Sequence, residues 1–351
     1  MYVSKERERR DKMKKILCVT LALLCALLCL SSCGAQLYKQ GEGELKIVAT
    51  VFVPFDIARE VTGGKAELVL LQSNGADLHD YTPTTSALAE LNSADILICI
   101  GGVTDDSWID SAVAASENEA LTVIKLTELC EGELTELEGH HHSDYCEKMH
   151  AHEHEEHSHG HEEHSHEHSA DDGHGHVADE HVWTSPKNVI SITERVASVC
   201  AEKDQANAEI YNANAERFKA ALTELDARYR EEAEGSEKKT LVFADRFPFI
   251  YLTREYGICH YAAFSGCSSE TDASFSTAAR LLGAVTENGL NCVIVTENTD
   301  GKLAESIADS LGCEILVLNS LQSVTAEQID GGITYLSAME QNLAVLTQAL
   351  S

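Results

Sequence analysis

The stretch from Ala66 to Ser93, AELVLLQSNGADLHDYTPTTSALAELNS, sets the architecture of this chain. Its first residues, Ala66–Leu71, are a short apolar run that predicts a buried strand, and its last, Thr84–Ser93, predict a helix. The polar loop between them carries His79. A strand followed by a helix is half of a βαβ unit, so the stretch predicts a parallel sheet with helices packed on it.

The same alternation recurs along the chain in two sets, which flank a mainly helical region at Lys187–Glu232. The predicted strands of the two sets are Leu45–Val53, Asp95–Ile100, Leu121–Leu126, Leu241–Ala244, Cys292–Thr296 and Glu314–Leu318. The predicted helices are Pro54–Val61, Phe249–Tyr256, Thr277–Asn288, Lys302–Leu311 and a C-terminal helix from about Gly332. We therefore expect an α/β fold of two lobes with mostly parallel sheets, joined by a long backbone helix, with the ligand cleft between the lobes.

This pattern divides the chain into five predicted parts. They are a lipoprotein signal peptide (1–33), a tether (34–43), an N-terminal α/β lobe (44–186) with a His-rich insertion (140–176), a linking helical region (187–235) and a C-terminal α/β lobe (236–351).

The first 33 residues have the pattern of an export signal. Lys14 and Lys15 precede an apolar run from Ile16 to Leu30, which is short for a membrane span. The sequence Leu30-Ser31-Ser32-Cys33 resembles the lipobox of bacterial lipoproteins, in which Cys33 is lipidated and becomes the mature N-terminus. An uncleaved anchor helix is the alternative. Either way, the rest of the chain is expected outside the cytoplasmic membrane and held to it. We expect the protein to be a monomer.

The whole chain carries a formal charge of −32, although its first 33 residues are net basic. So acidic a body repels a phosphate backbone, which excludes nucleic acid as a partner. It suits the attraction of divalent cations. Disulfides are permitted in an oxidising compartment, but Cys99 and Cys292 lie in strand-like apolar runs and are expected as buried thiols.

Two histidines outside the His-rich insertion lie in polar motifs. His79 belongs to GADLHDYTP (75–83), and His181 belongs to DEHVWTSP (179–186), just before a predicted helix start. The carboxyl edge of a parallel sheet is where binding sites form, and His79 is expected there. Each histidine taken alone is also compatible with an ordinary surface residue.

Taken together, the two motifs are recognisable. The pattern G-x-D-x-H-x-Y-x-P followed by D-x-H-x-W-x-x-P resembles the zinc/manganese solute-binding lipoproteins of ABC transporters, although Leu78 replaces a proline common in that family. The resemblance extends over nearly the whole body. It implies that His79 and His181 are metal ligands of the first lobe. Imidazole suits Zn²⁺, whereas oxygen-rich sites favour Mn²⁺, which is kept as the alternative metal.

The second lobe departs from the family pattern. The family places a His or Glu ligand shortly before an aromatic-x-aromatic stretch, and here that position falls on Arg246 or, with a shift, on Asp245. Arginine stays protonated and cannot bind a metal. The fourth family ligand, usually an acid, would lie near Asn319.

Other acids are therefore candidates for the second lobe. Glu270 lies in the loop 264–272, and we select Glu270 and Asp245 as the second-lobe ligands, with Glu297 as a third option. The alternative for Glu270 is an ion pair with Arg246. His260 is expected to be packed or on the surface and not to bind metal.

Fourteen of the 17 histidines lie in the insertion 140–176, where they alternate with Glu, Ser and Gly. The segment has no apolar period, so we expect a loop without a packed core that binds several Zn²⁺ ions loosely. A merely solubilising loop is the alternative. The predicted auxiliary ligands are His140, His141, His142, His150, His152, His154, His157, His159, His161, His164, His166, His168, His174 and His176.

The sequence thus predicts an extracytoplasmic, lipid-anchored receptor that binds Zn²⁺ between its lobes and passes it to an ABC permease. The alternative is a surface zinc buffer or sensor that is not coupled to transport. A zinc hydrolase is disfavoured, because the chain has no H-E-x-x-H motif and no similar pattern with a general base.

Overall fold

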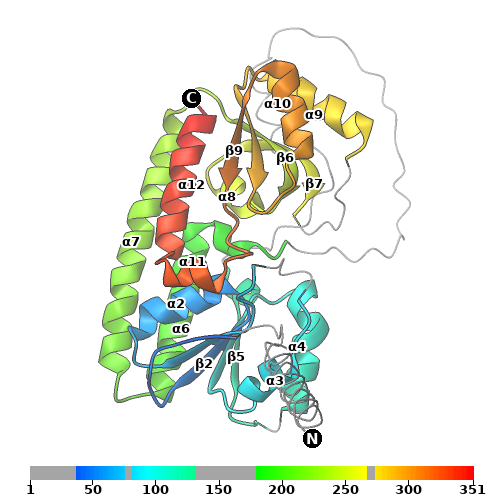
Figure 1. Ribbon diagram of the computed structural model, residues 1–351. Coiled ribbons are helices and arrows are strands. Elements are labelled where there is room, and N and C mark those ends of the chain that lie inside the picture. Colours follow the sequence, from blue (N-terminus) through cyan, green and yellow to red (C-terminus); the bar gives the residue numbers. More distant parts are fainter. Residues whose placement is uncertain (1–36, 76–80, 117, 131–178, 267–272) are drawn as a thin grey trace, which may run out of the picture. The chain divides into compact units, whose positions relative to one another are not determined.

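The computed structural model describes residues 37–75, 81–116, 118–130, 179–266 and 273–351 (Figure 1). These residues belong to one compact unit, Leu37–Ser351. The predicted signal peptide, the His-rich insertion, His79 and Glu270 lie outside the described residues. None of the helices in the described part of the chain has both the length and the apolar character needed to span a membrane.

The first sheet has five strands in the order β1-β3-β2-β4-β5. They are β1 (Tyr38–Gln40), β2 (Lys46–Ala49), β3 (Glu67–Leu70), β4 (Ile96–Cys99) and β5 (Thr122–Lys125). All neighbours pair in parallel except β1, which runs antiparallel to β3 with Tyr38 opposite Leu70. The parallel pairs confirm the predicted βαβ arrangement of this sheet.

The second sheet has four strands in the order β7-β6-β8-β9, and all of its pairs are parallel. They are β6 (Thr240–Phe247), β7 (Cys259–Ser265), β8 (Cys292–Thr296) and β9 (Glu314–Leu318). The register between β6 and β7 shifts between Phe243 and Arg246, so Asp245 lies at an irregularity of the sheet. This irregularity is at the carboxyl end of β6, where the candidate site is found.

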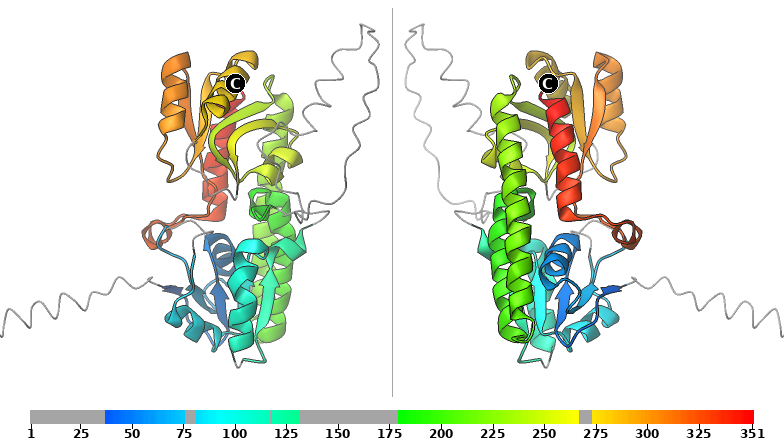
Figure 2. Two further views of the ribbon diagram at one scale, coloured as in Figure 1. Left: turned by 90° about the vertical axis from the view of Figure 1, so that its right-hand side faces the viewer. Right: turned by 90° about the vertical axis from the view of Figure 1, so that its left-hand side faces the viewer.

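Helices cover both faces of each sheet (Figure 1). They are α2 (Phe52–Thr62), α3 (Thr85–Leu91), α4 (Val103–Ala115), α6 (Pro186–Lys203), α7 (Ala208–Gly235), α8 (Ile250–Glu255), α9 (Phe275–Glu287), α10 (Lys302–Leu311), α11 (Ala326–Asp330) and α12 (Tyr335–Ala349), with short 3₁₀ turns η2 (Leu126–Leu129) and η3 (Val182–Thr184). Helices α7 and α12 lie side by side in both views of Figure 2 and contact one another.

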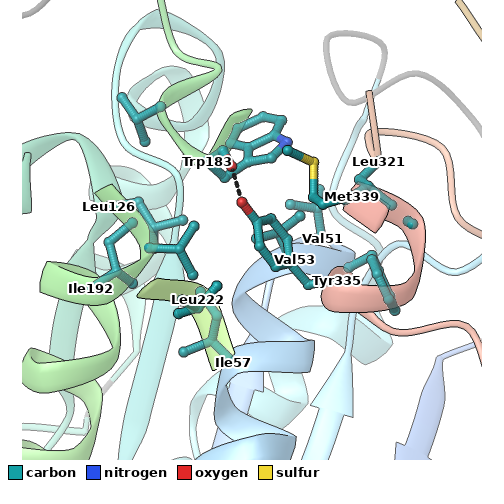
Figure 3. Packing of buried hydrophobic residues seen from close by; sticks show 14 of the residues in the cluster. Val51, Val53, Ile57, Leu126, Trp183, Ile192, Leu222, Leu321, Tyr335 and Met339 are labelled. Atoms are coloured by element: carbon teal, nitrogen blue, oxygen red, sulfur yellow. Dashed lines mark hydrogen bonds between the residues drawn. The ribbon is translucent and has the colours of Figure 1, made fainter. Parts of the chain in front are cut away.

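The buried apolar residues form three clusters, and successive residues of a strand belong to different clusters. In β2, Ile47 belongs to a large shared core, while Val48 faces a cluster under α3 and α4. In β6, Leu241 belongs to the same shared core, while Val242 faces a cluster under α9 and α10. One continuous apolar core therefore joins the two sheets, and helices α2, α6, α7 and α12 contribute to it (Figure 3). We call the part built on the first sheet the first half and the part built on the second sheet the second half. Burial of this extent resists separation of the two halves.

Several features differ from the sequence prediction. Residues 34–43 were expected to form a tether, but β1 (38–40) lies within them and pairs with β3. Strand β7 and helix α4 were not predicted, because the polar start of β7 and the acidic start of α4 hide their periodicity. The linking region is two helices, α6 and α7, separated by a turn whose Asp204 carboxylate accepts a hydrogen bond from Tyr211 Oη at 2.6 Å.

Candidate metal centre

The carboxyl ends of several strands meet at a pocket of about 170 Å³. Gly75 follows β3 of the first sheet, whereas Gly266 follows β7 and Glu297 follows β8 of the second sheet. The other lining residues are mostly polar. Among the lining residues that the structure describes, Arg246 is the only one with a positive charge. The carboxyl edge of parallel strands is therefore the place where both sheets contribute to one site.

The chain enters the His79 loop through Gly75, which is fixed against the second half of the molecule. Asn74 forms an isolated antiparallel bridge with Thr325, and Ala326 N donates to Ser73 O at 2.9 Å. Gly75 has a φ of +73°, and a Cβ there would lie 2.8 Å from the Thr325 methyl group. Only glycine fits this backbone comfortably. His79 itself is outside the described residues, but the chain leading to it lines the pocket.

His181 is completely buried, and Asp179 orients its ring. The two side chains are joined by a hydrogen bond of 2.8 Å between His181 Nδ1 and Asp179 Oδ1. A carboxylate only accepts, so Nδ1 carries the proton and the ring lone pair is on Nε2. The same Oδ1 accepts from the His181 backbone N at 2.9 Å. A carboxylate that fixes the tautomer of a histidine is the usual support of an imidazole metal ligand.

The loop around His181 is held from both sides. Thr184 Oγ1 donates to His181 O at 2.9 Å, and helix α6 then begins with Pro186 in its first turn, where a missing N–H costs nothing. On the other side, Tyr251 Oη of α8 donates to Asp179 O at 2.8 Å. The Asp179–His181 pair is thus anchored by the second half of the molecule as well as by its own helix.

Gly266 brings the second sheet directly against this pair. A Cβ at Gly266 would lie 2.8 Å from Phe247 O, 3.1 Å from His181 Cε1 and 3.2 Å from Asp179 Oδ2. The chain at the end of β7 therefore passes within van der Waals distance of the histidine ring. It leads directly into residues 267–272, which contain Glu270 and lie outside the described residues.

The described carboxylates of the second sheet are engaged in hydrogen bonds of their own. Asp245 Oδ2 accepts from Thr296 N at 3.0 Å and from Thr296 Oγ1. Glu297 accepts from Ser320 through both oxygens, from N at 2.7 Å and from Oγ at 2.6 Å. Asp245 thus ties β6 to β8, and Glu297 ties β8 to the loop after β9.

Two acids near the first-sheet edge carry no role in the sequence prediction, although both are buried. Asp179 orients His181, as described, and Glu180 packs on Gly102, where a Cβ would lie 2.8 Å from Glu180 Oε1. The available signal for Asp179 was its spacing, because an acid two residues before a histidine can reach both the backbone N–H and the ring N–H. Nothing in the sequence pattern distinguishes Glu180 from a surface acid.

Tyr81 and Asp105 complete this edge of the first sheet. Asp105 Oδ2 accepts from Ile100 N at 2.6 Å and from Gly101 N at 3.2 Å, which fixes the turn after β4. Burial raises the pKa of Tyr81 to about 12, and the charge of Asp105 adds to the shift. The tyrosine therefore stays protonated at physiological pH.

The remaining sequence-predicted residues behave as structural groups. His260 is buried at the start of β7 and stacks on Phe247 with ring centroids 3.7 Å apart, which confirms its packed role. Cys99 and Cys292 are buried free thiols, as expected, whereas Cys259 is in a disulfide. Among the described residues, no three His, Cys, Asp or Glu side chains come together as a metal-binding group.

A second pocket, of about 760 Å³, lies where the ends of α7 and α12 meet. Glu231, Glu232, Glu237 and Glu340 give it an acidic rim. None of the predicted ligands that the structure describes lines it, whereas Glu297 lines the smaller pocket beside His181, which remains the candidate site.

The fold and the site define a class of protein. Two α/β halves whose strand ends converge on a polar pocket, beside a buried histidine oriented by a carboxylate, are the arrangement of a binding protein for a small polar ligand or ion. Residues 47–349 match the family described as zinc-uptake complex component A, periplasmic (ZnuA), and the chain belongs to that family.

Individual relatives agree with this assignment. The chain is 30% identical over 340 residues to the zinc-binding lipoprotein AdcA of Streptococcus pneumoniae strain R6, a match that covers 96% of this chain and 61% of AdcA. The chain therefore spans about three fifths of the length of that relative.

Two solved structures share the fold. The Zn(II)-bound ZnuA-like domain of Streptococcus pneumoniae AdcA is similar with a TM-score of 0.64 and 25% identity, over 87% of this chain and 98% of that chain. The metal-dependent lipoprotein YcdH of Bacillus subtilis is similar with a TM-score of 0.67 and 22% identity, over 87% of this chain and 99% of that chain. The predicted α/β fold of two mostly parallel sheets is thus confirmed.

Proposed function

We propose that this protein binds Zn²⁺ outside the cytoplasmic membrane and delivers it to an ABC permease. The observation that carries the proposal is the buried His181, whose Nδ1 proton is held by Asp179 and whose Nε2 lone pair is therefore the one available to a metal. Relatives in the family are named as zinc-binding or zinc-uptake proteins, which supports zinc as the ligand. Zn²⁺ is the cargo here, and we propose no chemical reaction.

The proposed ligands are His79 and His181 from the first half, with Glu270 and Asp245 from the second. Zinc accepts imidazole nitrogen and carboxylate oxygen in one tetrahedral site, so this set suits it. The loops that carry His79 and Glu270 leave the described structure at Gly75 and Gly266, and both glycines line the pocket. Asp245 would use the oxygen that Thr296 does not occupy. A set richer in oxygen would favour Mn²⁺, the alternative metal.

The His-rich insertion 140–176 is proposed as a loose zinc reservoir. Its auxiliary ligands run from His140 to His176, and neutral imidazole binds zinc at neutral pH. The segment follows η2 and precedes Asp179, so it enters the chain next to His181. Zinc captured there would be close in sequence to the proposed tight site.

We further propose a lipid anchor at Cys33 and a monomeric body that closes little on its cargo. The apolar core shared by both sheets supports limited motion, because a wide hinge opening would expose it. Small-angle scattering of zinc-free and zinc-loaded protein should therefore give nearly equal radii of gyration. A large decrease on loading would contradict this part of the proposal.

The decisive experiment is a zinc titration of three forms of the soluble body: unchanged, lacking residues 140–176, and carrying His79→Ala with His181→Ala. We expect the double substitution to abolish the tightest site and the deletion to remove only weaker sites. The reverse result would refute the receptor function. A parallel titration with Mn²⁺ would establish which metal the site prefers.

One observation favours a second function, that of a surface zinc buffer or sensor. Asp245 and Glu297 already accept hydrogen bonds within their own half, and Arg246 adds a positive charge to the pocket. Such a site would bind zinc less tightly than a transport receptor does. If zinc binding depends almost entirely on residues 140–176, the buffer function replaces the proposed one.

A further inference from the structure

Trp183 occupies a central position between the candidate ligand His181 and the second half of the molecule. It is 1% exposed and lies in η3, two residues after His181. Its ring meets the His181 ring edge-on, with centroids 5.3 Å apart and planes at 61°. Movement of Trp183 would therefore change the packing of the His181 ring directly.

Two hydrogen bonds fix Trp183 to separate elements of the second half. Its indole Nε1–H donates to Ser320 O at 2.8 Å, just after β9. Its backbone carbonyl accepts from Tyr335 Oη at 2.8 Å, at the start of α12 (Figure 3). Buried hydrogen bonds of this kind are costly to break, because the freed groups cannot reach water.

The Ser320 contact leads straight to the wall of the pocket. Ser320 donates to both oxygens of Glu297 through its backbone N and its Oγ. The neighbouring Asn319 is itself fixed by Asn342 of α12, which donates to its carbonyl and accepts from its N–H, each at 2.8 Å. The segment Asn319–Ser320, which is hydrogen-bonded to Trp183, is therefore held in place, and its Ser320 lines the pocket.

The Tyr335 contact leads into the first half. Tyr335 N donates to Asp56 Oδ2 of α2 at 2.6 Å, and Arg59 of the same helix donates to Ile333 O at 2.9 Å. The start of α12 is thus fixed to α2. Trp183 is therefore hydrogen-bonded both to the segment after β9 and to the start of α12.

We propose that Trp183 is a positioning residue that sets the distance between His181 and the pocket wall at Glu297. This inference rests on the proposed zinc-binding function. Trp183 does not bind the metal. It keeps His181 Nε2 at a fixed place relative to the second-sheet side of the site, so that a zinc ion meets ligands from both sides without a rearrangement of the chain.

The test is Trp183→Phe in the intact chain. Phenylalanine keeps an aromatic edge beside His181, but it removes the indole N–H donor together with part of the buried ring volume. We expect the affinity of the tightest Zn²⁺ site, measured by competition with a chelator, to fall about tenfold. The d–d absorption spectrum of the protein with one equivalent of Co²⁺ should also change, because it reports the coordination geometry directly. Tyr335→Phe, which removes the other bond to Trp183, should act in the same direction.

Tyr229→Phe is the matched control. Tyr229 is buried, and its Oη donates to Met339 O at 2.7 Å, so its loss removes the same kind of tyrosine–carbonyl bond between α7 and α12. It should lower the melting temperature like Tyr335→Phe and leave zinc affinity and the cobalt spectrum unchanged.

The outcomes separate the two proposals. If the unchanged protein has a tight site dependent on His79 and His181, but Trp183→Phe and Tyr335→Phe keep its affinity and its cobalt spectrum, the positioning role is wrong and the zinc function stands. If the unchanged protein has no such site, the proposed function fails and the positioning role fails with it. Should Trp183→Phe not fold, Tyr335→Phe decides by the same two readouts.

Discussion

The two sides of the candidate site are built differently. On the first-sheet side, His181 is supported by the Asp179 carboxylate, which itself makes no other described ion pair, so the support serves the ring. On the second-sheet side, Asp245 and Glu297 serve the sheet, because Thr296 and Ser320 donate to them. The hydrogen bonds of His181 orient a nitrogen lone pair, which is what a metal ligand requires. The hydrogen bonds of Asp245 and Glu297 join neighbouring segments of the second sheet, so their main effect is on the stability of the fold.

We infer from this difference which side of the site controls zinc affinity. The first-sheet side supplies a prepared imidazole, while the second-sheet side supplies shape through Gly266 and charge through Arg246 and Glu297. Substitutions on the first side should therefore change zinc affinity most. Those on the second side should change affinity and stability together.

The largest effect on zinc affinity after loss of the histidines themselves is expected from Asp179→Ala. It removes the acceptor of His181 Nδ1–H, so the ring can rotate and change tautomer. Loss of such a partner lowers metal affinity about 10- to 100-fold. Isothermal titration calorimetry with Zn²⁺ measures the change.

Asp204→Ala is the control for this prediction. Asp204 accepts hydrogen bonds from Tyr211 Oη and Asn207 Nδ2 at the turn between α6 and α7, outside the pocket lining. It removes a hydrogen-bonded carboxylate without touching the site. Equal losses of zinc affinity in the two variants would show that general destabilisation, and not ring orientation, is responsible.

On the second-sheet side, Glu270→Gln should lower zinc affinity at least about tenfold if Glu270 is a ligand. Loss of a residue that only hydrogen-bonds to a metal ligand already has an effect of that size. The measurement is again a zinc titration. Glutamine has nearly the size of glutamate, so the substitution removes the negative charge with little change in volume. An unchanged affinity would remove Glu270 from the ligand set and favour its ion pair with Arg246.

Asp245→Asn separates the two roles of its carboxylate. We expect a loss of about 1–3 kcal/mol of unfolding free energy, because the bonds to Thr296 weaken, and a fall in zinc affinity. Thr296→Val removes the hydroxyl donor alone and should lower stability with no effect on zinc. If both variants behave alike in urea melts and in zinc titrations, Asp245 is structural and not a ligand.

The sequence predicted the parallel sheets well because their strands are short apolar runs with clear ends. Strand β8 (Cys292–Thr296), helix α10 (Lys302–Leu311) and strand β9 (Glu314–Leu318) have the predicted bounds. It missed β7, which begins Cys259-His260-Tyr261, because a buried histidine and a half-buried tyrosine interrupt the apolar run that marks a buried strand. A strand whose buried residues include polar types cannot be recognised from apolar pattern alone.

The site was harder to predict for a different reason. Spacing and resemblance select His181 as a candidate ligand, but the hydrogen bond from Thr296 to Asp245 joins residues 51 positions apart. No local pattern encodes such a contact. The same holds for Gly266, whose role follows only from its distance to the His181 ring.

Gly266→Ala tests this close approach and should have a moderate effect. The added methyl group would lie too near Phe247 O and push against the His181 ring. Overpacking of this kind costs about 1–3 kcal/mol, and part of it should appear as a severalfold loss of zinc affinity. Gly283→Ala is the control, since its Cβ would meet nothing closer than Glu287 Oε1 at 3.9 Å within α9. It should raise stability by about 0.5–1 kcal/mol and leave zinc binding unchanged.

Asp56→Asn should have the smallest effect on zinc affinity, because Asp56 belongs to the shared core and not to either side of the site. Burial in α2 raises the pKa of Asp56 to about 6, although Arg59 opposes the shift. The folded-state pKa thus lies above the unfolded value of about 3.9, and the native chain binds the proton more tightly.

The sign of the pH dependence follows from this shift. The stabilisation by the bound proton is fully present below pH 4 and is lost as the pH rises through 6, by up to about 3 kcal/mol. Urea unfolding of zinc-free protein between pH 4 and 7 should show this loss in the unchanged chain and not in Asp56→Asn. At pH 7 the two should bind zinc within about twofold of each other, because an asparagine oxygen still accepts from Tyr335 N. A difference in stability that does not vary with pH would mean that Arg59 keeps Asp56 charged throughout, and a large loss of zinc affinity would mean that the core, and not the two sides of the pocket, sets the geometry of the site.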